Sequence, residues 1–162
     1  MADTTSKIFL DWDEIQECVK ILCTKIFMDY PNIDSVMGLP RGGLIPAVLI
    51  SHQLGLPFVL HPGKNTIVVD DINDTGHTLS EAPGAYWAVL HHKPTSKFKP
   101  DLYAREVGPE WIVYPWERED SKALPDYLKQ VEQFADSHYI GGLSMPKKFN
   151  NGKTIKIRFS SV

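Results

Sequence analysis

Residues 66–80 constrain the fold of this 162-residue chain more than any other stretch. They begin with the apolar run Thr66-Ile67-Val68-Val69, which is typical of a fully buried strand. Asp70 and Asp71 end the run, and a short polar turn that can open a helix follows at residues 74–78. In α/β proteins, a buried strand that leads into a helix N-terminus is a common binding site for phosphorylated ligands. The stretch therefore predicts an α/β fold with a phosphate site at one end of a central strand.

The turn at residues 74–78, Asp-Thr-Gly-His-Thr, has the chemistry that such a site needs. Its backbone N–H groups and the hydroxyls of Thr75 and Thr78 can surround an anion, and Gly76 permits tight curvature. Asp70 and Asp71 can accept hydrogen bonds from sugar hydroxyls or hold a hydrated Mg²⁺. The alternative is an ordinary strand–turn–helix with an acidic turn and no ligand.

The remainder of the chain alternates helices with strands. Asp11 as N-cap and Glu14 at position N3 predict a helix start with an acidic capping box, and Pro31 ends that helix. A second helix is predicted over 44–54, and a third from about Thr78. Besides the strand that begins at Thr66, strands are predicted at 33–39, 58–60, 86–90 and 102–107. This alternation predicts a mainly parallel five-stranded sheet with helices on both faces.

Composition excludes several classes of protein. A net charge of -3 and a pI near 6.0 argue against a nucleic-acid partner, which needs a basic face. No apolar run is long enough to span a membrane, and the N-terminus lacks a signal-peptide core. Cys18 and Cys23 lie five residues apart on different faces of one predicted helix, so no disulfide is expected. These features predict a cytoplasmic protein with no membrane partner.

The stretch from Val68 to Leu79 resembles the binding signature for phosphoribosyl pyrophosphate (PRPP) in type I phosphoribosyltransferases. The resemblance implies that Asp70 and Asp71 bind the ribose and Mg²⁺, and that residues 74–78 bind the 5'-phosphate. It also implies that Asp74 acts catalytically near N7 of a base; Asp74 as a helix N-cap is an alternative, and both roles can hold. His77 either approaches the 5'-phosphate or is an ordinary exposed histidine.

A second glycine-rich turn follows the strand predicted at 33–39. Leu39, Pro40, Arg41, Gly42 and Gly43 bring backbone and a guanidinium close to any ligand, although most Arg-Gly-Gly turns are only turns. This turn resembles the pyrophosphate loop of the same family. The resemblance implies pyrophosphate binding and a non-proline cis peptide between Pro40 and Arg41.

A third segment resembles xanthine-guanine phosphoribosyltransferases in particular. Trp111, Ile112 and Glu117 lie in a stretch that matches the base-binding segment of those enzymes, and Lys93 precedes a proline as their base-reading lysine does. A lysine donates but cannot accept hydrogen bonds, so it favours a 6-oxopurine (guanine, xanthine or hypoxanthine) over adenine. The alternative for Trp111 is a core tryptophan. Relatives are commonly dimers or tetramers, so a homo-oligomer is expected.

The chain departs from the family in two places. Only residues 61–65 separate the second and third predicted strands, too few for the mobile lid that the family usually has there. This departure favours an alternative, a PRPP- or nucleotide-binding regulatory protein. A third alternative is an enzyme that acts on another nucleophile, with Trp111 only structural. The second departure is an extension over 118–162, with a predicted amphipathic helix after residue 121 and a strand at 153–159. We predict a core over 1–117, with a small base-binding hood near 105–117, and the extension packed on it.

Overall fold

The computed structural model of the chain describes residues 6–78 and 86–119. The chain divides into two compact units, Met1–Ser121 and Lys122–Val162, and the described residues belong to the first. The helix and the strand predicted for the extension lie outside the described residues. The same holds for most of the helix predicted from Thr78, of which residues 77 and 78 are described and helical.

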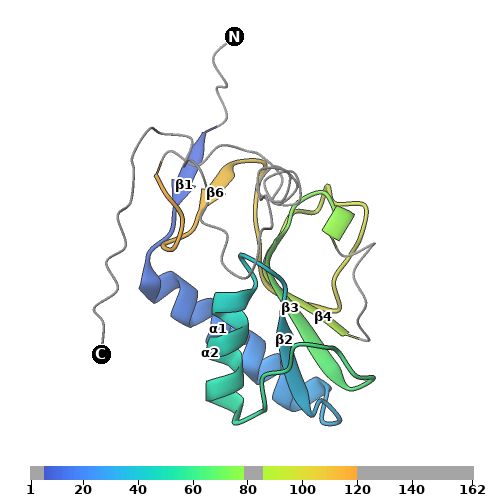
Figure 1. The fold of residues 1–162 in the computed structure, drawn as a ribbon. Coiled ribbons are helices and arrows are strands. Elements are labelled where there is room, and N and C mark those ends of the chain that lie inside the picture. The colour runs from blue at the N-terminus through green and yellow to red at the C-terminus, as the bar shows by residue number, and fades with distance from the viewer. Residues whose placement is uncertain (1–5, 79–85, 120–162) are drawn as a thin grey trace, which may run out of the picture. The chain divides into compact units, whose positions relative to one another are not determined.

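The main sheet consists of four parallel strands in the order β2-β3-β4-β5 (Figure 1). Their bounds are β2 (Ser35–Gly38), β3 (Thr66–Asn73), β4 (Tyr86–His92) and β5 (Leu102–Glu106). Val69 of β3 is paired with Gly38 of β2 and with Ala88 of β4, so β3 is a central strand. Parallel strands all end at the same edge of a sheet, and this edge receives the turns predicted to bind ligand. The α/β class and the parallel sheet are confirmed.

The strand predicted at 58–60 is reduced to one parallel bridge between Phe58 and Val36. Val36 N–H donates to the Pro57 carbonyl at 3.0 Å, and Val59 N–H donates to the Val36 carbonyl at 2.8 Å. Pro57 has no N–H with which to extend this ladder, and Leu60 is 77% exposed. Within the described residues, the main sheet therefore has four continuous strands rather than the five predicted.

A second, two-stranded parallel sheet pairs β1 (Lys7–Phe9) with β6 (Trp111–Val113). The sequence analysis did not predict β1, because three residues carry no usable periodicity. Backbone bonds from Trp111 N–H to Ser6 O (2.9 Å) and from Leu10 N–H to Val113 O (3.0 Å) extend the pairing at both ends. The N-terminal segment thus holds one side of the predicted hood.

Both described helices pack on one face of the main sheet (Figure 1). Helix α1 (Trp12–Asp29) begins with the predicted capping box, since Glu14 N–H donates to Asp11 and Asp11 N–H donates to Glu14. Helix α2 (Leu44–Leu54) has the predicted bounds and ends at Gly55, whose φ of 66° is left-handed. The apolar face predicted for α1 is buried: Ile15, Cys18, Val19, Leu22 and Ile26.

Alternating strand residues divide the core into two clusters. Ile67 and Val69 of β3 join the helices in the larger cluster, whereas Val68 belongs to a smaller cluster on the opposite face. The smaller cluster also contains Trp87 and Val89 of β4. No helix among the described residues covers this face. Helices on both faces therefore stay a prediction for this chain.

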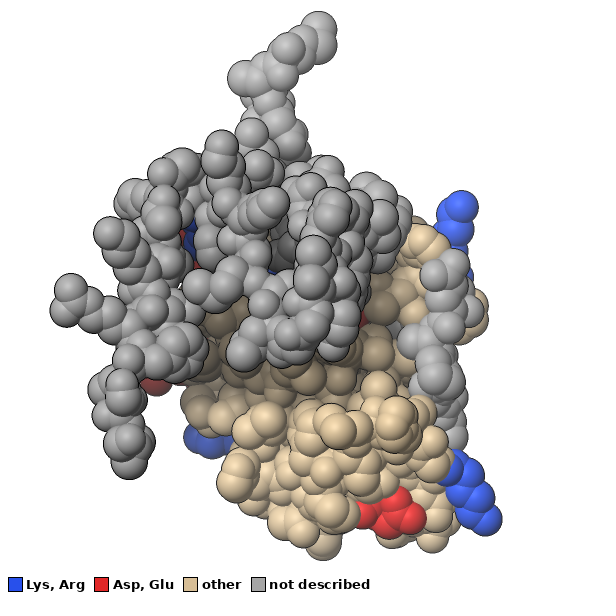
Figure 2. Space-filling view, in the orientation of Figure 1, with Lys and Arg blue, Asp and Glu red and all other residues tan. Residues whose placement is uncertain are grey.

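In the view of Figure 2, most of the described surface carries neither acidic nor basic side chains, and the charged ones lie near its margin. None of the helices within 6–78 and 86–119 has the length and hydropathy needed to cross a membrane.

Candidate active site

The 39–43 turn lies directly against the acidic end of β3. Leu39 N–H donates to the Val69 carbonyl at 2.9 Å, which fixes the start of the turn on the strand. A Cβ added at Gly42 would overlap the Asp71 carboxylate, and one added at Gly43 would overlap the Val69 carbonyl. Both glycines are therefore needed for this close approach. The structure brings together the predicted pyrophosphate turn and the predicted ribose site, and it confirms the cis peptide between Pro40 and Arg41.

Asp70 and Asp71 each hold one carboxylate oxygen near the backbone. Asp70 Oδ1 accepts from Asp71 N–H at 2.9 Å, and Asp71 Oδ1 accepts from Ile72 N–H at 2.7 Å. The other Asp71 oxygen lies nearest to Gly42. Within the described residues no three acidic, histidine or cysteine side chains form a metal cage. Two adjacent carboxylates instead fit a Mg²⁺ that keeps water ligands and shares substrate phosphates.

The structure joins the predicted catalytic residue to the predicted base-reading residue. The Lys93 ammonium lies 3.1 Å from Asp74 Oδ1, and the side chains are 8% and 41% exposed, respectively. Lys93 N–H also donates to the Asn73 carbonyl at 3.0 Å, so the residue after β4 is fixed beside the end of β3. A buried ammonium next to a half-exposed carboxylate gives the site one donor and one acceptor in adjacent positions.

The turn at residues 74–78 packs against the loop at residues 93–98. Gly76 has a φ of 84°, and an added Cβ would lie 2.8 Å from Phe98 Cβ and from Ser96 Oγ. Lys97 N–H donates to the Thr75 carbonyl at 3.3 Å. Gly76 is therefore required both by its left-handed backbone and by this close contact. Thr75, His77 and Thr78 are exposed at the surface of the turn.

Asn73 is a site residue that the sequence analysis missed. Its side chain is 1% exposed and reaches three groups. Its amide nitrogen donates to the Phe98 carbonyl and to His92 Nδ1 (3.1 Å), and its Oδ1 accepts from Ser96 Oγ at 3.0 Å. Burial lowers the pKa of His92, which keeps Nδ1 able to accept this bond. Asn73 thus ties β3 to the loop that carries Lys93.

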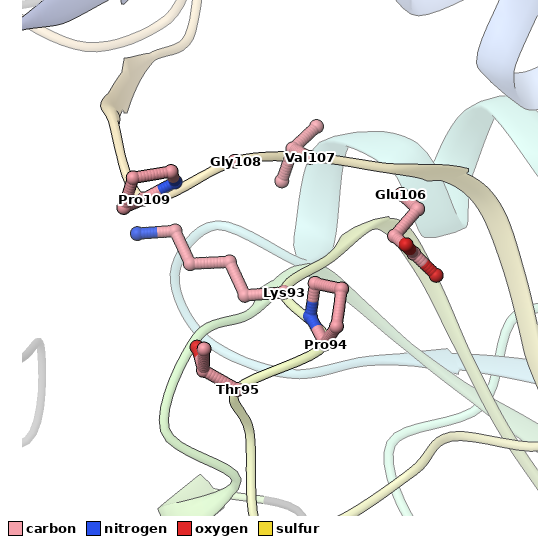
Figure 3. A pocket seen from close by; sticks show the side chains of 7 residues that line it. All are labelled: Lys93, Pro94, Thr95, Glu106, Val107, Gly108 and Pro109. Carbon is pink, nitrogen blue, oxygen red and sulfur yellow. The ribbon is translucent and has the colours of Figure 1, made fainter.

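A pocket of about 550 Å³ lies at the carboxyl ends of β4 and β5. Its lining residues are Lys93, Pro94, Thr95, Glu106, Val107, Gly108 and Pro109. In Figure 3 the Lys93 side chain points toward Pro109, whereas Glu106 lies at the other end of the labelled group. The pocket is large enough for a small ring ligand, and a buried cation lies in its wall.

The other three residues predicted to bind a base do not line this pocket. Ile112 is 5% exposed and its side chain belongs to the larger core cluster, so that side chain is not available to a ligand. Glu117 Oε2 accepts from Tyr114 N–H at 3.1 Å and closes a local turn. Trp111 is half-buried on β6. Their predicted roles in base binding stay predictions.

Taken together, these groups define a class of protein. The carboxyl edge of a parallel sheet carries a glycine-rich turn, two adjacent carboxylates, a phosphate-type turn and a Lys93–Asp74 pair beside a pocket. This arrangement is typical of α/β proteins that bind a phosphorylated sugar or nucleotide at the strand ends.

Comparison with known proteins gives the family. No protein-family model matches the chain. It is 27% identical over 135 residues to the xanthine-guanine phosphoribosyltransferase of Chromohalobacter salexigens, covering 67% of this chain and 82% of that protein. With the crystal structure of the Pyrococcus horikoshii purine phosphoribosyltransferase it shares 30% identity and a TM-score of 0.62, covering 74% of this chain and 99% of that one. The chain therefore belongs to the type I phosphoribosyltransferase family.

Proposed function

We propose that this protein is a purine phosphoribosyltransferase of nucleotide salvage. It transfers the 5-phosphoribosyl group of PRPP to a 6-oxopurine (guanine, xanthine or hypoxanthine) and releases pyrophosphate. The names of the relatives support this proposal, since xanthine-guanine and purine phosphoribosyltransferases match the chain at 26–30% identity.

The observation that carries the proposal is the Lys93–Asp74 pair at 3.1 Å. A 6-oxopurine presents an acceptor, O6, next to N7 on the same edge of the ring. In this proposal Lys93 donates to O6 while Asp74 interacts with a proton at N7. Adenine has an amino group in place of O6, and it would set a donor against the ammonium. The pair therefore supports a 6-oxopurine as substrate.

The other groups suit the remainder of PRPP. The turn at residues 74–78 would bind the 5'-phosphate, Asp70 and Asp71 the ribose hydroxyls, and Arg41 with its neighbouring amides the pyrophosphate. In the reaction, N9 of the purine forms a bond to C1 of the ribose as the bond from C1 to the pyrophosphate oxygen breaks. The purine loses one proton, for which Asp74 is the acceptor.

Asp70 and Asp71 are also the residues that would hold Mg²⁺ together with the substrate. When bound, the ion neutralises charge on the departing pyrophosphate. The residues' own contribution is to orient the ribose, because their backbone bonds hold both carboxylates at the end of β3.

The alternative of a regulatory protein rested on the short segment before β3. That segment is indeed short in the structure: Gly63 and Thr66 close a tight turn with bonds of 2.8 and 3.2 Å. The relatives' names nevertheless favour a transferase over a regulatory protein. A dimer or tetramer stays a prediction, which light scattering of the purified protein would test.

The test of the proposal is direct. The protein is incubated with Mg²⁺, labelled PRPP and each purine in turn, and nucleotide and pyrophosphate are measured. We expect turnover with 6-oxopurines and at least about 100-fold less with Asp74→Asn, at similar PRPP affinity, because a positioned proton acceptor contributes that much or more. Asp13→Asn, an exposed change in the first turn of α1, is the control. Tight PRPP binding without any nucleotide would refute the transferase and favour the regulatory protein.

A further inference from the structure

A row of polar side chains runs from α1 to the acidic end of β3. The Cys18 sulfur lies 3.7 Å from His91 Nε2, and His91 Nδ1 lies 2.9 Å from the Tyr114 hydroxyl. The Tyr114 hydroxyl in turn donates to the Asp71 carbonyl at 3.0 Å. Cys18, His91 and Tyr114 are each at most 3% exposed. Buried polar groups in such a row fix one another, because each unmade bond there is costly.

The proton positions in this row follow from its last member. The Asp71 carbonyl can only accept, so Tyr114 gives it the hydroxyl proton, and the Tyr114 oxygen accepts from His91 Nδ1–H. His91 Nε2 then carries no proton and accepts from the Cys18 thiol. Burial and the charge of Arg105 lower the pKa of His91 from 6.5 to about 4, and burial raises the pKa of the Cys18 thiol. A neutral imidazole with one donor and one acceptor is what the row requires.

Tyr114 is also part of the predicted hood. Its ring stacks on Trp116, with centroids 4.8 Å apart and planes 14° apart, and Trp116 contacts Trp12 of α1. The Tyr114 backbone forms bonds in both directions with Glu117. One side chain of the segment at residues 111–117 therefore reaches from that segment to β3.

The hydrogen bond from Tyr114 reaches β3 beyond the last residue that pairs with β2. β2 pairs with β3 only as far as Val69, two residues before Asp71. β4 still pairs with β3 as far as Asn73, so the Asp71 backbone is held by the ladder on the β4 side but not on the β2 side. The Tyr114 hydroxyl supplies a further contact to this backbone, and it comes from the segment predicted to bind the base.

We propose that Tyr114 is a positioning residue. Its hydroxyl, bonded to the Asp71 carbonyl and to His91, fixes the position of Asp70 and Asp71 relative to the base-binding segment. This inference rests on the proposed function and deepens it. Tyr114 touches neither substrate; it acts by holding Asp71 where the ribose and its Mg²⁺ are expected to bind. No short motif identifies such a residue, because its partners lie 43 and 23 positions away along the chain.

The test is Tyr114→Phe, which keeps the ring and its stacking on Trp116 but removes the hydroxyl. We expect the affinity for PRPP with Mg²⁺, measured by calorimetry, and kcat/KM for PRPP both to fall at least about tenfold. Tyr30→Phe removes a hydroxyl at the other end of the sheet, where Tyr30 packs edge-on against Tyr86, and should change neither quantity. A Tyr114→Phe protein with wild-type affinity and wild-type kcat/KM, or with only a lowered melting temperature, would overturn the proposal.

A second measurement needs no activity. In ¹⁵N NMR of the histidine rings, His91 should show a protonated Nδ1 and an unprotonated Nε2, and Tyr114→Phe should shift the Nδ1 signal. The reverse tautomer of His91 in the wild type would contradict the proton positions assigned to Cys18, His91 and Tyr114 and would overturn the proposal. If the wild type binds PRPP but makes no nucleotide, the proposed function fails, while the binding and NMR results still decide the role of Tyr114.

Discussion

Replacing Asn73 with leucine should destabilise the protein and weaken purine binding together. Leucine keeps the branching and the number of side-chain heavy atoms, so the change removes hydrogen bonds without leaving a cavity. Asn73 is 1% exposed and makes three side-chain bonds, to Phe98, His92 and Ser96. These bonds hold the loop of residues 93–98, which carries Lys93, against β3.

The magnitude follows from these three bonds. At about 1 kcal/mol of net stabilisation each, Asn73→Leu should lower the free energy of unfolding by about 3 kcal/mol. For a chain of this size that corresponds to a melting temperature lower by about 6–12 °C. In the variant the Ser96 hydroxyl no longer donates to Asn73 and can donate to the Phe98 carbonyl, 3.1 Å away, so the cost should not greatly exceed this sum.

Urea denaturation and purine KM are the measurements. Ser96→Ala is the matched control, because it removes one partner of Asn73 and should cost about 1 kcal/mol. KM for the purine should rise in Asn73→Leu more than KM for PRPP, since Lys93 is on the released loop. If Asn73→Leu loses less than about 1 kcal/mol and keeps its purine KM, the three bonds do not hold the loop, and our reasoning is wrong.

Three further outcomes are expected. Because the folded pKa of His91 is lowered from 6.5 to about 4, the folded state binds fewer protons than the unfolded state between these values. The contribution of His91 to the free energy of unfolding is then fully present above pH 6.5, and the free energy of unfolding should fall by up to about 3 kcal/mol as the pH is lowered toward 4. If the free energy of unfolding of His91→Gln falls equally with pH over this range, the prediction is wrong. Gly42→Ala should raise KM for PRPP at least tenfold, because the added Cβ would displace the Asp71 carboxylate. Gly63→Ala should leave this KM unchanged, because its Cβ would only contact Thr66 Oγ1 at 3.6 Å. Equal effects of the two changes would argue against the close approach of Gly42 to Asp71. Trp111→Ala should weaken purine binding by about 1–3 kcal/mol if the ring stacks on the base, and unchanged affinity would assign it a structural role.

The sequence predicted those parts of the fold whose signals are local. The bounds of α2, the capping box of α1 and the start of β3 at Thr66 all depend on residues within one or two turns of each other, whereas β3 continues past the acidic pair to Asn73. The same holds for the glycines at 42 and 43, whose close approach to β3 the structure supports. The prediction of a full strand at 58–60 was wrong, because Pro57 and the exposed Leu60 limit the pairing there to one bridge.

The missed residues share a different property. Asn73, His91 and Tyr114 carry side chains common in any core or turn, and their importance comes only from partners far away in sequence. His91 and Cys18 are 73 positions apart. Residues that contact a ligand phosphate from one turn must follow a fixed spacing along the chain, so they form a recognisable sequence motif. Residues that hold such a motif in place can come from any segment that the fold brings near, so they form no sequence motif of their own.

This difference has a consequence for variants of the protein. A net hydrogen bond contributes only about 1 kcal/mol to folding, whereas a displacement of about 1 Å at a reacting centre can reduce the rate about 100-fold, equivalent to nearly 3 kcal/mol. Loss of a positioning bond should therefore reduce activity more than stability. Tyr114→Phe, which loses one bond to Asp71 and keeps its stacked ring, should show this imbalance clearly. Asn73→Leu loses three bonds at once, so its stability should fall nearly as far as its activity.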